Sequence, residues 1–325
     1  MLNFCTLFDS RYLSRGVAMY QSLNKCCTSF HLYIFAFDKK SYDFFHCNNF
    51  ENVTVISRTE FEDNELLRIK STRTKGEYCW TCTSSTILYV LNHYSVEICT
   101  YIDADLYFFS SPEILIDELG KKSILLTEHR YTPEYDQSAT SGKYCVQFMS
   151  FRNDRRGREA LEWWRAKCIE WCYNRMEDGK FGDQKYLDDW TERFEGVHVL
   201  QHLGGGVAPW NIQQYTFTRK DNRICGVELS SGRAFDLIFF HFHNLAFISS
   251  HYFAPTFYRK NDMSVLKYIF RVYVHHICDL RKRFDVIASS EHYFTVKETI
   301  LHCMRVIRRS YRIKSELYAL WYQFF

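Results

Sequence analysis

Short apolar runs alternate with segments of helical periodicity over most of the chain. The runs cover residues 2–8, 30–37, 51–57, 96–102, 122–129 and 144–151, and the helix-like segments cover 14–25, 77–93 and 156–175. This alternation predicts an α/β fold with a mostly parallel central sheet and helices on both faces. Ligands of such sheets bind beyond the carboxyl ends of the strands. Polar residues that directly follow the runs are therefore the first candidates for a site.

The pattern changes near residue 260. Two long stretches with helical spacing follow, 264–284 and 295–325, without further alternation of strands and helices. We therefore expect a main domain over residues 1–258 and a helical C-terminal appendage over residues 259–325.

The appendage is strongly basic. Between residues 271 and 314, ten lysines and arginines stand against four acidic residues, although the formal net charge of the chain is only +3. Four arginines fall on one helical face: Arg305, Arg308, Arg309 and Arg312. A basic amphipathic end favours attachment to an anionic membrane surface. The alternative is a helix packed on the main domain with solvated arginines. Nucleic acid is disfavoured, because no recognition motif accompanies the charge.

The composition is that of a densely packed globular protein, with 46% hydrophobic residues and only 4 prolines. No apolar stretch reaches the roughly 20 residues needed to span a bilayer, and the first residues show no basic leader. The 13 cysteines include one CxxC pair, Cys79 and Cys82, with no second pair at zinc spacing. These features favour a cytoplasmic protein with reduced thiols over a disulfide or zinc framework.

Two aspartates follow the apolar run in EICTYIDADLYFF, residues 97–109. In an extended segment, Asp103 and Asp105 point to the same side, with the small Ala104 between them. Two close carboxylates repel each other and need a counter-charge to remain ionised. A divalent cation such as Mg²⁺ or Mn²⁺ supplies that charge and prefers oxygen ligands. The alternative is a pair of ordinary turn or cap residues.

The segment YIDADLYFFSSPEIL, residues 101–115, resembles the D-x-D segment of GT-A nucleotide-sugar glycosyltransferases, in particular the glycogenin and bacterial lipopolysaccharide galactosyltransferase type. The resemblance implies a Rossmann-like GT-A domain over residues 1–258. It also implies that residues 103–105 contact the diphosphate of a UDP-linked sugar, with Mn²⁺ or Mg²⁺ on the two aspartates. The third metal ligand in this family is a strand-end histidine. In RAFDLIFFHFHNL that position is His241, and His243 is the second choice.

The start of the chain, FCTLFDSRY, matches the family's nucleotide-binding strand and loop. The resemblance implies that Asp9 binds the uracil edge and Tyr12 stacks on the base, while Thr6 and Leu7 line the pocket. The alternative is a helix cap at Asp9 or Ser10 and a packed tyrosine.

Two later segments complete the resemblance. In DGKFGDQKYLDDW, Asp183 and Gln184 match the family's Asp-Gln pair at a helix start, which faces the donor sugar; an acidic helix cap is the alternative. The triple glycine at 204–206 permits a close approach of backbone to a ligand. Trp210 and Asn211, which follow it, are candidates for the acceptor site.

The sequence departs from the family in several places. Asn244 stands where the family has a glycine, and no Lys-Pro-Trp follows, so the diphosphate needs another partner, for which His243 and Lys75 are candidates. Gln147 is a candidate to replace the polar contact of the family's Asn-Ala-Gly strand. The resemblance favours a retaining reaction; an inverting one would need a carboxylate base, and Glu128 or Asp183 could serve.

These observations predict a metal-dependent hexosyltransferase that transfers sugar to a hydroxyl of a glycan or lipid-linked glycan. Cell-surface polysaccharide or lipopolysaccharide synthesis is the expected setting, in the cytoplasm and at the inner face of the membrane. A D-x-D phosphotransferase or phosphatase is an alternative, although Leu106 and Tyr107 do not suit its motif. An inactive binding protein of glycosyltransferase shape is another.

Overall fold

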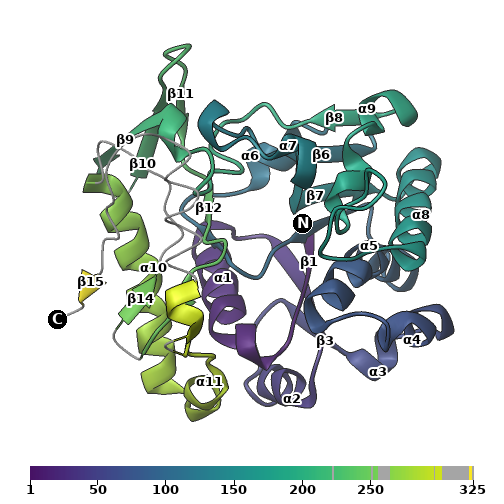
Figure 1. Ribbon diagram of the computed structural model, residues 1–325, viewed down its shortest axis with the longest axis horizontal. Helices are drawn as coiled ribbons and strands as arrows, with labels where there is room; N and C mark the ends of the chain where they lie inside the picture. Colours follow the sequence, from purple (N-terminus) through teal and green to yellow (C-terminus); the bar gives the residue numbers. More distant parts are fainter. Residues whose placement is uncertain (222, 250–251, 255–263, 296, 302–321, 324–325) are drawn as a thin grey trace.

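The computed structural model describes residues 1–221, 223–249, 252–254, 264–295, 297–301 and 322–323. A sheet of seven strands in the order β3-β2-β1-β4-β7-β6-β8 forms the centre of the protein (Figure 1). Its strands are β1 (Leu2–Phe8), β2 (Phe30–Ala36), β3 (Val53–Ser57), β4 (Ile98–Ile102), β6 (Ile124–Glu128), β7 (Tyr144–Arg152) and β8 (Val197–Val199). All pairs are parallel except those of β7, which runs antiparallel to β4 and β6. The predicted α/β class and mostly parallel sheet are confirmed.

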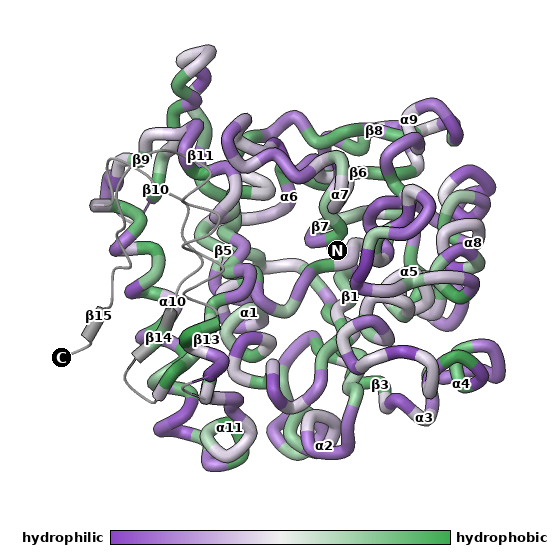
Figure 2. The backbone as a smooth tube through the Cα atoms, viewed as in Figure 1, coloured by the Kyte–Doolittle hydropathy of each residue, from purple (hydrophilic) through white to green (hydrophobic). Residues whose placement is uncertain are grey.

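Helices cover both faces of this sheet, and each strand supplies alternate side chains to the two faces. In β1, Phe4 and Phe8 enter one core with α1 (Leu13–Cys26), whereas Cys5 and Leu7 enter the other core. That second core holds α5 (Lys75–His93) and α8 (Arg155–Glu170). Figure 2 shows hydrophobic residues along the central strands and mixed hydropathy along the outer helices. The sheet is thus buried on both sides, which leaves its strand ends for chemistry.

Smaller elements complete the main domain. The short helices are α2 (Lys39–Cys47), α3 (Arg58–Phe61), α4 (Asn64–Lys70), α6 (Glu113–Asp117), α7 (Ser138–Ser141) and α9 (Trp190–Arg193). Two small antiparallel sheets are β5 (Leu106–Phe108) with β12 (Phe239–His241), and β9 (Tyr215–Lys220) with β10 (Arg223–Glu228) and β11 (Ala234–Asp236). A third consists of β13 (Ala246–Phe247), β14 (Tyr252–Ala254) and β15 (Tyr322–Gln323).

Several element boundaries differ from the prediction. Helix α5 begins two residues early because Thr74 and Glu77 form a capping box. Helix α8 ends at Glu170 rather than 175, and there the Arg73 guanidinium donates to the carbonyl of Ile169, which has no partner within the helix. The apolar run 233–245 is not one strand, because β11 and β12 belong to different sheets.

The described part of the appendage packs into the main core. Helices α10 (Ser264–Arg283) and α11 (Asp285–Ser290) follow the undescribed residues 255–263, and α10 lies against α1 (Figure 1). Leu266 and Phe270 share one hydrophobic cluster with Phe4 and Phe8. The predicted boundary after residue 258 and the four arginines of the predicted basic face lie outside the described residues. Among the helices that the structure describes, none is both long and apolar enough to cross a bilayer.

A buried ion cluster joins the appendage to the main domain. The carboxylate of Glu291 is fully buried and lies 2.9 Å from Arg15 of α1 and 2.9 Å from Arg281 of α10. Ser14 donates a further hydrogen bond of 2.6 Å to the same carboxylate. The Arg281 guanidinium lies 3.7 Å from the centre of the Phe247 ring. One carboxylate therefore balances two buried cations from different parts of the chain.

We predict that Glu291→Gln lowers the free energy of unfolding by about 3–5 kcal/mol, because it leaves two buried guanidinium groups without their counter-charge. Urea denaturation at pH 7 measures the change. The matched control is Glu195→Gln, which breaks a pair with Arg156 whose glutamate side chain is 75% exposed. Surface pairs contribute little, so equal losses in the two variants would contradict the importance of the buried cluster.

Candidate active site and metal centre

Two aspartates and a histidine converge where the central strand β4 ends. Strand β4 ends at Ile102, and β5 begins at Leu106, so Asp103 and Asp105 lie in the turn between them. Strand β12 pairs antiparallel with β5 and places His241 opposite Leu106. The Nε2 atom of His241 lies 3.1 Å from Oδ1 of Asp105 and 3.7 Å from Oδ2 of Asp103. One ligand atom from each of the three residues lies within 4.8 Å of the other two.

The two buried carboxylates of this cluster carry more negative charge than the histidine can balance. The side chains of Asp105 and His241 are only 11% and 4% exposed. Burial raises the pKa of Asp103 to about 6, with a further contribution from Asp105, although His241 opposes the shift. The pKa of Asp105 is lowered, since His241 outweighs the effect of burial. One imidazolium cannot neutralise two carboxylates, so the residues present fit a divalent cation with open coordination positions.

Asp183 lies close enough to this cluster for the charge of Asp103 to raise its pKa. It precedes a single 3₁₀ turn, Gln184–Leu187, and its backbone carbonyl accepts a hydrogen bond of 2.9 Å from Trp164 Nε1. The side chain is buried, and the Thr83 hydroxyl and the charge of Asp103 act on it. Burial first, and then Asp103, raises the pKa of Asp183 to about 7. The Gln184 amide instead donates 2.6 Å to the carbonyl of Ser141.

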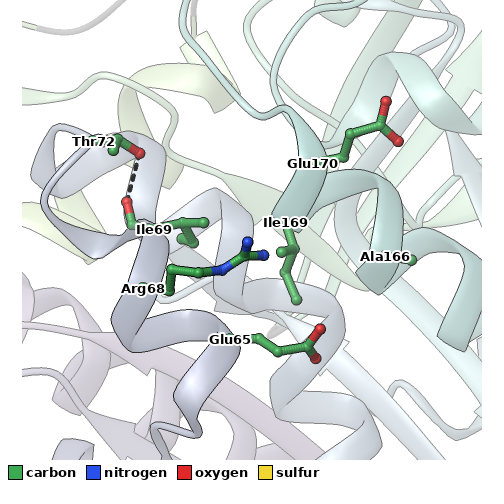
Figure 3. Close-up of a pocket in the computed structure, with 7 residues that line it drawn as sticks. All are labelled: Glu65, Arg68, Ile69, Thr72, Ala166, Ile169 and Glu170. Atoms are coloured by element: carbon green, nitrogen blue, oxygen red, sulfur yellow. Dashed lines mark hydrogen bonds between the residues drawn. The ribbon is translucent and has the colours of Figure 1, made fainter.

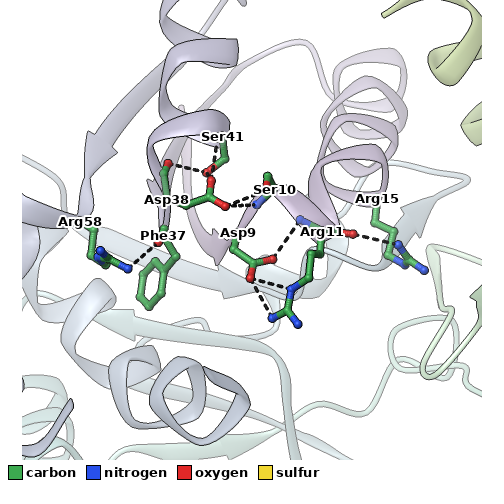
Figure 4. A network of polar contacts seen from close by, with 8 residues as sticks. All are labelled: Asp9, Ser10, Arg11, Arg15, Phe37, Asp38, Ser41 and Arg58. Atoms are coloured by element: carbon green, nitrogen blue, oxygen red, sulfur yellow. Dashed lines mark hydrogen bonds and ion pairs between the residues drawn. The ribbon is translucent and has the colours of Figure 1, made fainter. Parts of the chain in front are cut away.

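The loop after β1 is held by its own polar contacts. Asp9 caps the turn Ser10–Tyr12 by accepting from the Arg11 backbone, and it also pairs with the Arg11 guanidinium at 2.8 Å. Asp38 accepts from the backbone and hydroxyl of Ser10 and fixes the same loop (Figure 4). The cap that the sequence offered as the alternative for Asp9 is therefore present.

The other predicted nucleotide residues differ in accessibility. Tyr12 keeps 42% of its surface accessible. Burial of its hydroxyl, and then the charges of Asp105 and Asp103, raises the pKa of Tyr12 to about 12, although Arg15 opposes the shift. Thr6 is fully buried and Leu7 nearly so, at 7% exposure. Ala104 is also 7% exposed. Of this set, Tyr12 alone presents a substantial exposed surface beside the cluster.

The loop with the triple glycine forms a wall of the site. A Cβ on Gly204 would lie 1.8 Å from the carbonyl oxygen of Asp236, so a close approach of the protein's own backbone requires a glycine there. The Trp210 ring lies 5.4 Å from the rings of His241 and His243, measured between centroids. Asn211 is fully buried, and its amide bonds the backbone of His129, Gly206 and Ala208. In this structure the Asn211 side chain therefore stabilises the loop through hydrogen bonds to its backbone.

The candidates for the missing lysine occupy different places. His243 is exposed at the rim of the cluster, its ring centroid 5.4 Å from that of His241, but it is not one of the three grouped ligands. Lys75 is exposed at the first position of α5. Gln147 was predicted for a different role, the polar contact of the family's Asn-Ala-Gly strand. It is fully buried on β7, and neither atom of its amide has a hydrogen-bond partner among the described residues.

A separate hollow lies between α4 and α8, away from these residues (Figure 3). It is lined by Glu65, Arg68, Ile69, Thr72, Ala166, Ile169 and Glu170. None of the predicted site residues lines this hollow.

Comparison with known proteins places the chain in a family. No protein-family model matches it. It is 33% identical to the uncharacterized protein YfnD of Bacillus subtilis (strain 168) over 296 residues, which are 89% of this chain and 91% of YfnD. It is also 32% identical to YfnF of the same strain over 254 residues, 76% of this chain and 82% of YfnF. The chain belongs to the YfnD family.

The YfnD-family protein has the GT-A fold of glycosyltransferases. A crystal structure of an active-site mutant of LgtC matches 91% of this chain and 98% of that chain, with a TM-score of 0.52 and 11% identity. LgtC was also crystallised as a galactosyltransferase in complex with donor and acceptor sugar analogs, a structure that matches 64% of this chain and 76% of its own at a TM-score of 0.44 and 12% identity. At these identities the likeness concerns the fold, and the predicted GT-A architecture is confirmed.

The sequence alone did not indicate three residues that lie near the site: Arg15, Tyr273 and Glu291. Arg15 lies one helical turn after Tyr12, with its guanidinium 4.9 Å from the centre of that ring. Tyr273 and Glu291 come from the appendage. The spacing of Arg15 from Tyr12 was a usable signal, whereas Tyr273 sits in an ordinary amphipathic pattern that indicates only core packing.

We predict that Asp183→Asn stabilises the metal-free protein at pH 8 but not at pH 4. The folded protein holds the Asp183 proton up to about pH 7, whereas the unfolded chain releases it near its ordinary pKa of 3.8. The wild type therefore loses stability as the pH rises between these values, and the variant does not. At about 1.4 kcal/mol per pKa unit, the difference between about 7 and 3.8 makes the gain at pH 8 on the order of 4 kcal/mol.

Urea denaturation in the presence of EDTA measures this gain. The control is Asp117→Asn, the same change at an exposed position in α6. A gain that is the same at pH 4 and pH 8 would rule out the buried charge of Asp183 as its cause.

Proposed function

We propose that this YfnD-family protein is a metal-dependent glycosyltransferase of the hexosyltransferase type. It transfers a sugar from a UDP-linked donor to a hydroxyl of a glycan or lipid-linked glycan. The observation that carries the proposal is the meeting of Asp103, Asp105 and His241 at the carboxyl end of β4, within a GT-A fold. Carboxylates and an imidazole around one point suit Mn²⁺, with Mg²⁺ as the second choice.

The residues around the cluster divide the work of holding the donor. Asp103, Asp105 and His241 hold the cation, which when bound supplies positive charge to the diphosphate as the glycosidic bond breaks. His243, exposed at the rim, contacts a phosphate oxygen in place of the family's lysine. The exposed ring of Tyr12 stacks on the base, and Asp9 contacts its edge. Thr6 and Leu7 support that pocket from within β1.

The donor sugar lies toward Asp183. The buried carboxyl group of Asp183 forms hydrogen bonds with sugar hydroxyls, and Gln184, fixed by Ser141, borders the reacting carbon. Trp210 lines the acceptor side, and Asn211 holds the shape of that wall. We propose retention of configuration on the resemblance of the Asp-Gln segment. A phosphatase reading has no support in a GT-A fold, whereas an inactive binding protein shares every feature except turnover.

We predict that the protein releases UDP from at least one UDP-sugar when Mn²⁺ is present, and that EDTA abolishes the release. Asp105→Asn removes a ligand charge and lowers the rate by about 100-fold or more, since a ligand and its charge are lost together. The exposed Asp117→Asn leaves the rate unchanged. A coupled assay of UDP release over a panel of UDP-sugars measures these rates.

The same panel separates the alternatives. If donors raise the melting temperature but none is cleaved with any glycan acceptor, the protein is a binding protein. If no nucleotide-sugar is cleaved and none changes the melting temperature, the glycosyltransferase proposal is wrong.

Association with the membrane is a further part of the proposal. The basic C-terminal segment would bring the protein to an anionic inner leaflet, where lipid-linked acceptors of polysaccharide or lipopolysaccharide synthesis are presented. It rests on Arg305, Arg308, Arg309 and Arg312, which lie outside the described residues. Sedimentation with vesicles that contain or lack phosphatidylglycerol tests it, and equal binding to both would contradict it.

A further inference from the structure

Helix α10 buries a phenol whose hydroxyl has no hydrogen-bond partner among the described residues. Tyr273 is 0% exposed, and its hydroxyl makes no such bond. Its neighbour Tyr107 has a bonded hydroxyl, which lies 3.0 Å from Nδ1 of His276. A buried hydroxyl without a partner destabilises a fold, because the group has lost its water. A phenylalanine would fill the same space without this penalty, so the hydroxyl requires another explanation.

The position of Tyr273 links it to the metal centre. Its ring stacks on Phe242, with centroids 3.8 Å apart and planes at 13°. Phe242 follows His241 directly, and its backbone N–H donates 3.0 Å to the carbonyl of Asp105. Tyr273 therefore packs on the side chain of Phe242, the residue that links two of the three proposed ligands through its backbone. Burial first, and then Asp105 among other acids, raises the pKa of Tyr273, while Arg15 opposes the shift.

We propose that Tyr273 is a positioning residue for the metal centre, and that its hydroxyl donates to the Asp105 carboxylate through one ordered water. This inference rests on the proposed function, because it assigns Asp105 as a metal ligand. A hydrogen bond to a ligating carboxylate fixes its orientation and strengthens its hold on the ion. A bridging water satisfies a buried hydroxyl that has no direct partner among the described residues. The C-terminal appendage then contributes a group to the active site and is not only an attachment device.

The test is Tyr273→Phe in the full chain, titrated with Mn²⁺ alone and followed by the electron paramagnetic resonance signal of free Mn²⁺. We expect the Kd for Mn²⁺ to rise by about 10-fold to 100-fold. We also expect the metal-free melting temperature to stay the same or rise, because the unpaired hydroxyl is gone. The matched control is Tyr107→Phe, an adjacent phenol with its own partner in His276. It should lower the melting temperature and leave the Kd unchanged.

Each outcome decides a separate question. If Tyr273→Phe binds Mn²⁺ as the wild type does, or if Tyr107→Phe weakens binding equally, the role of Tyr273 is overturned. If the wild type binds no Mn²⁺, the metal centre and this inference both fall. If the wild type binds Mn²⁺ but cleaves no nucleotide-sugar, the proposed function fails, while the comparison of the two phenol variants still decides the role of Tyr273.

Discussion

Two carboxylates at the end of a buried strand need positive charge close by, and the surrounding structure is arranged around that need. Asp103 and Asp105 stand at the end of β4, the central strand of the seven, where the Asp105 side chain is only 11% exposed. The pairing of β12 with β5 brings His241 to them as a single counter-ion. Asp183 adds a third acidic group nearby, with a pKa raised to about 7. The excess of acid over base is what makes this strand end suitable for a divalent cation.

The same electrostatic logic ties the appendage to the main domain. Glu291 is a single buried carboxylate between Arg15 and Arg281, so this second cluster has a net positive charge. Arg15 also donates to the carbonyl of Leu245, in the loop that continues from His241. The charge of Arg15 also helps to lower the pKa of Asp105 and so to keep that carboxylate ionised. The acidic centre and the basic cluster are therefore adjacent and opposite in charge, and each makes the burial of the other less costly.

The parts of the fold that were predictable are those whose signal is local. The apolar composition of a run such as residues 2–8 is enough to predict a buried strand. Asp103 and Asp105 interrupt an apolar run and so indicate where a strand ends. The direction of a strand has no such signal, which is why the antiparallel β7 was not foreseen. His241 was found only through family resemblance, because it lies far from the aspartates in sequence. Tyr273 was missed because a buried phenol on an amphipathic helix looks the same in sequence whether it faces a core or a site. Glu291 was missed because it directly follows the short helix α11, where an acidic residue gives no signal of burial.

The absence of Lys-Pro-Trp after His241 has a consequence for how a diphosphate is held. Arg15 is a buried cation whose charge acts on Asp105, but its guanidinium already donates to Glu291 and to the carbonyls of Arg11 and Leu245. It therefore influences the site through its charge and not by contact. His243 at the rim has a titratable charge, and an imidazole is a weaker partner for phosphate than a lysine at neutral pH. On the proposed function, the bound cation balances more of the donor's negative charge, so this protein should depend more steeply on its metal than a glycosyltransferase with a lysine at this position.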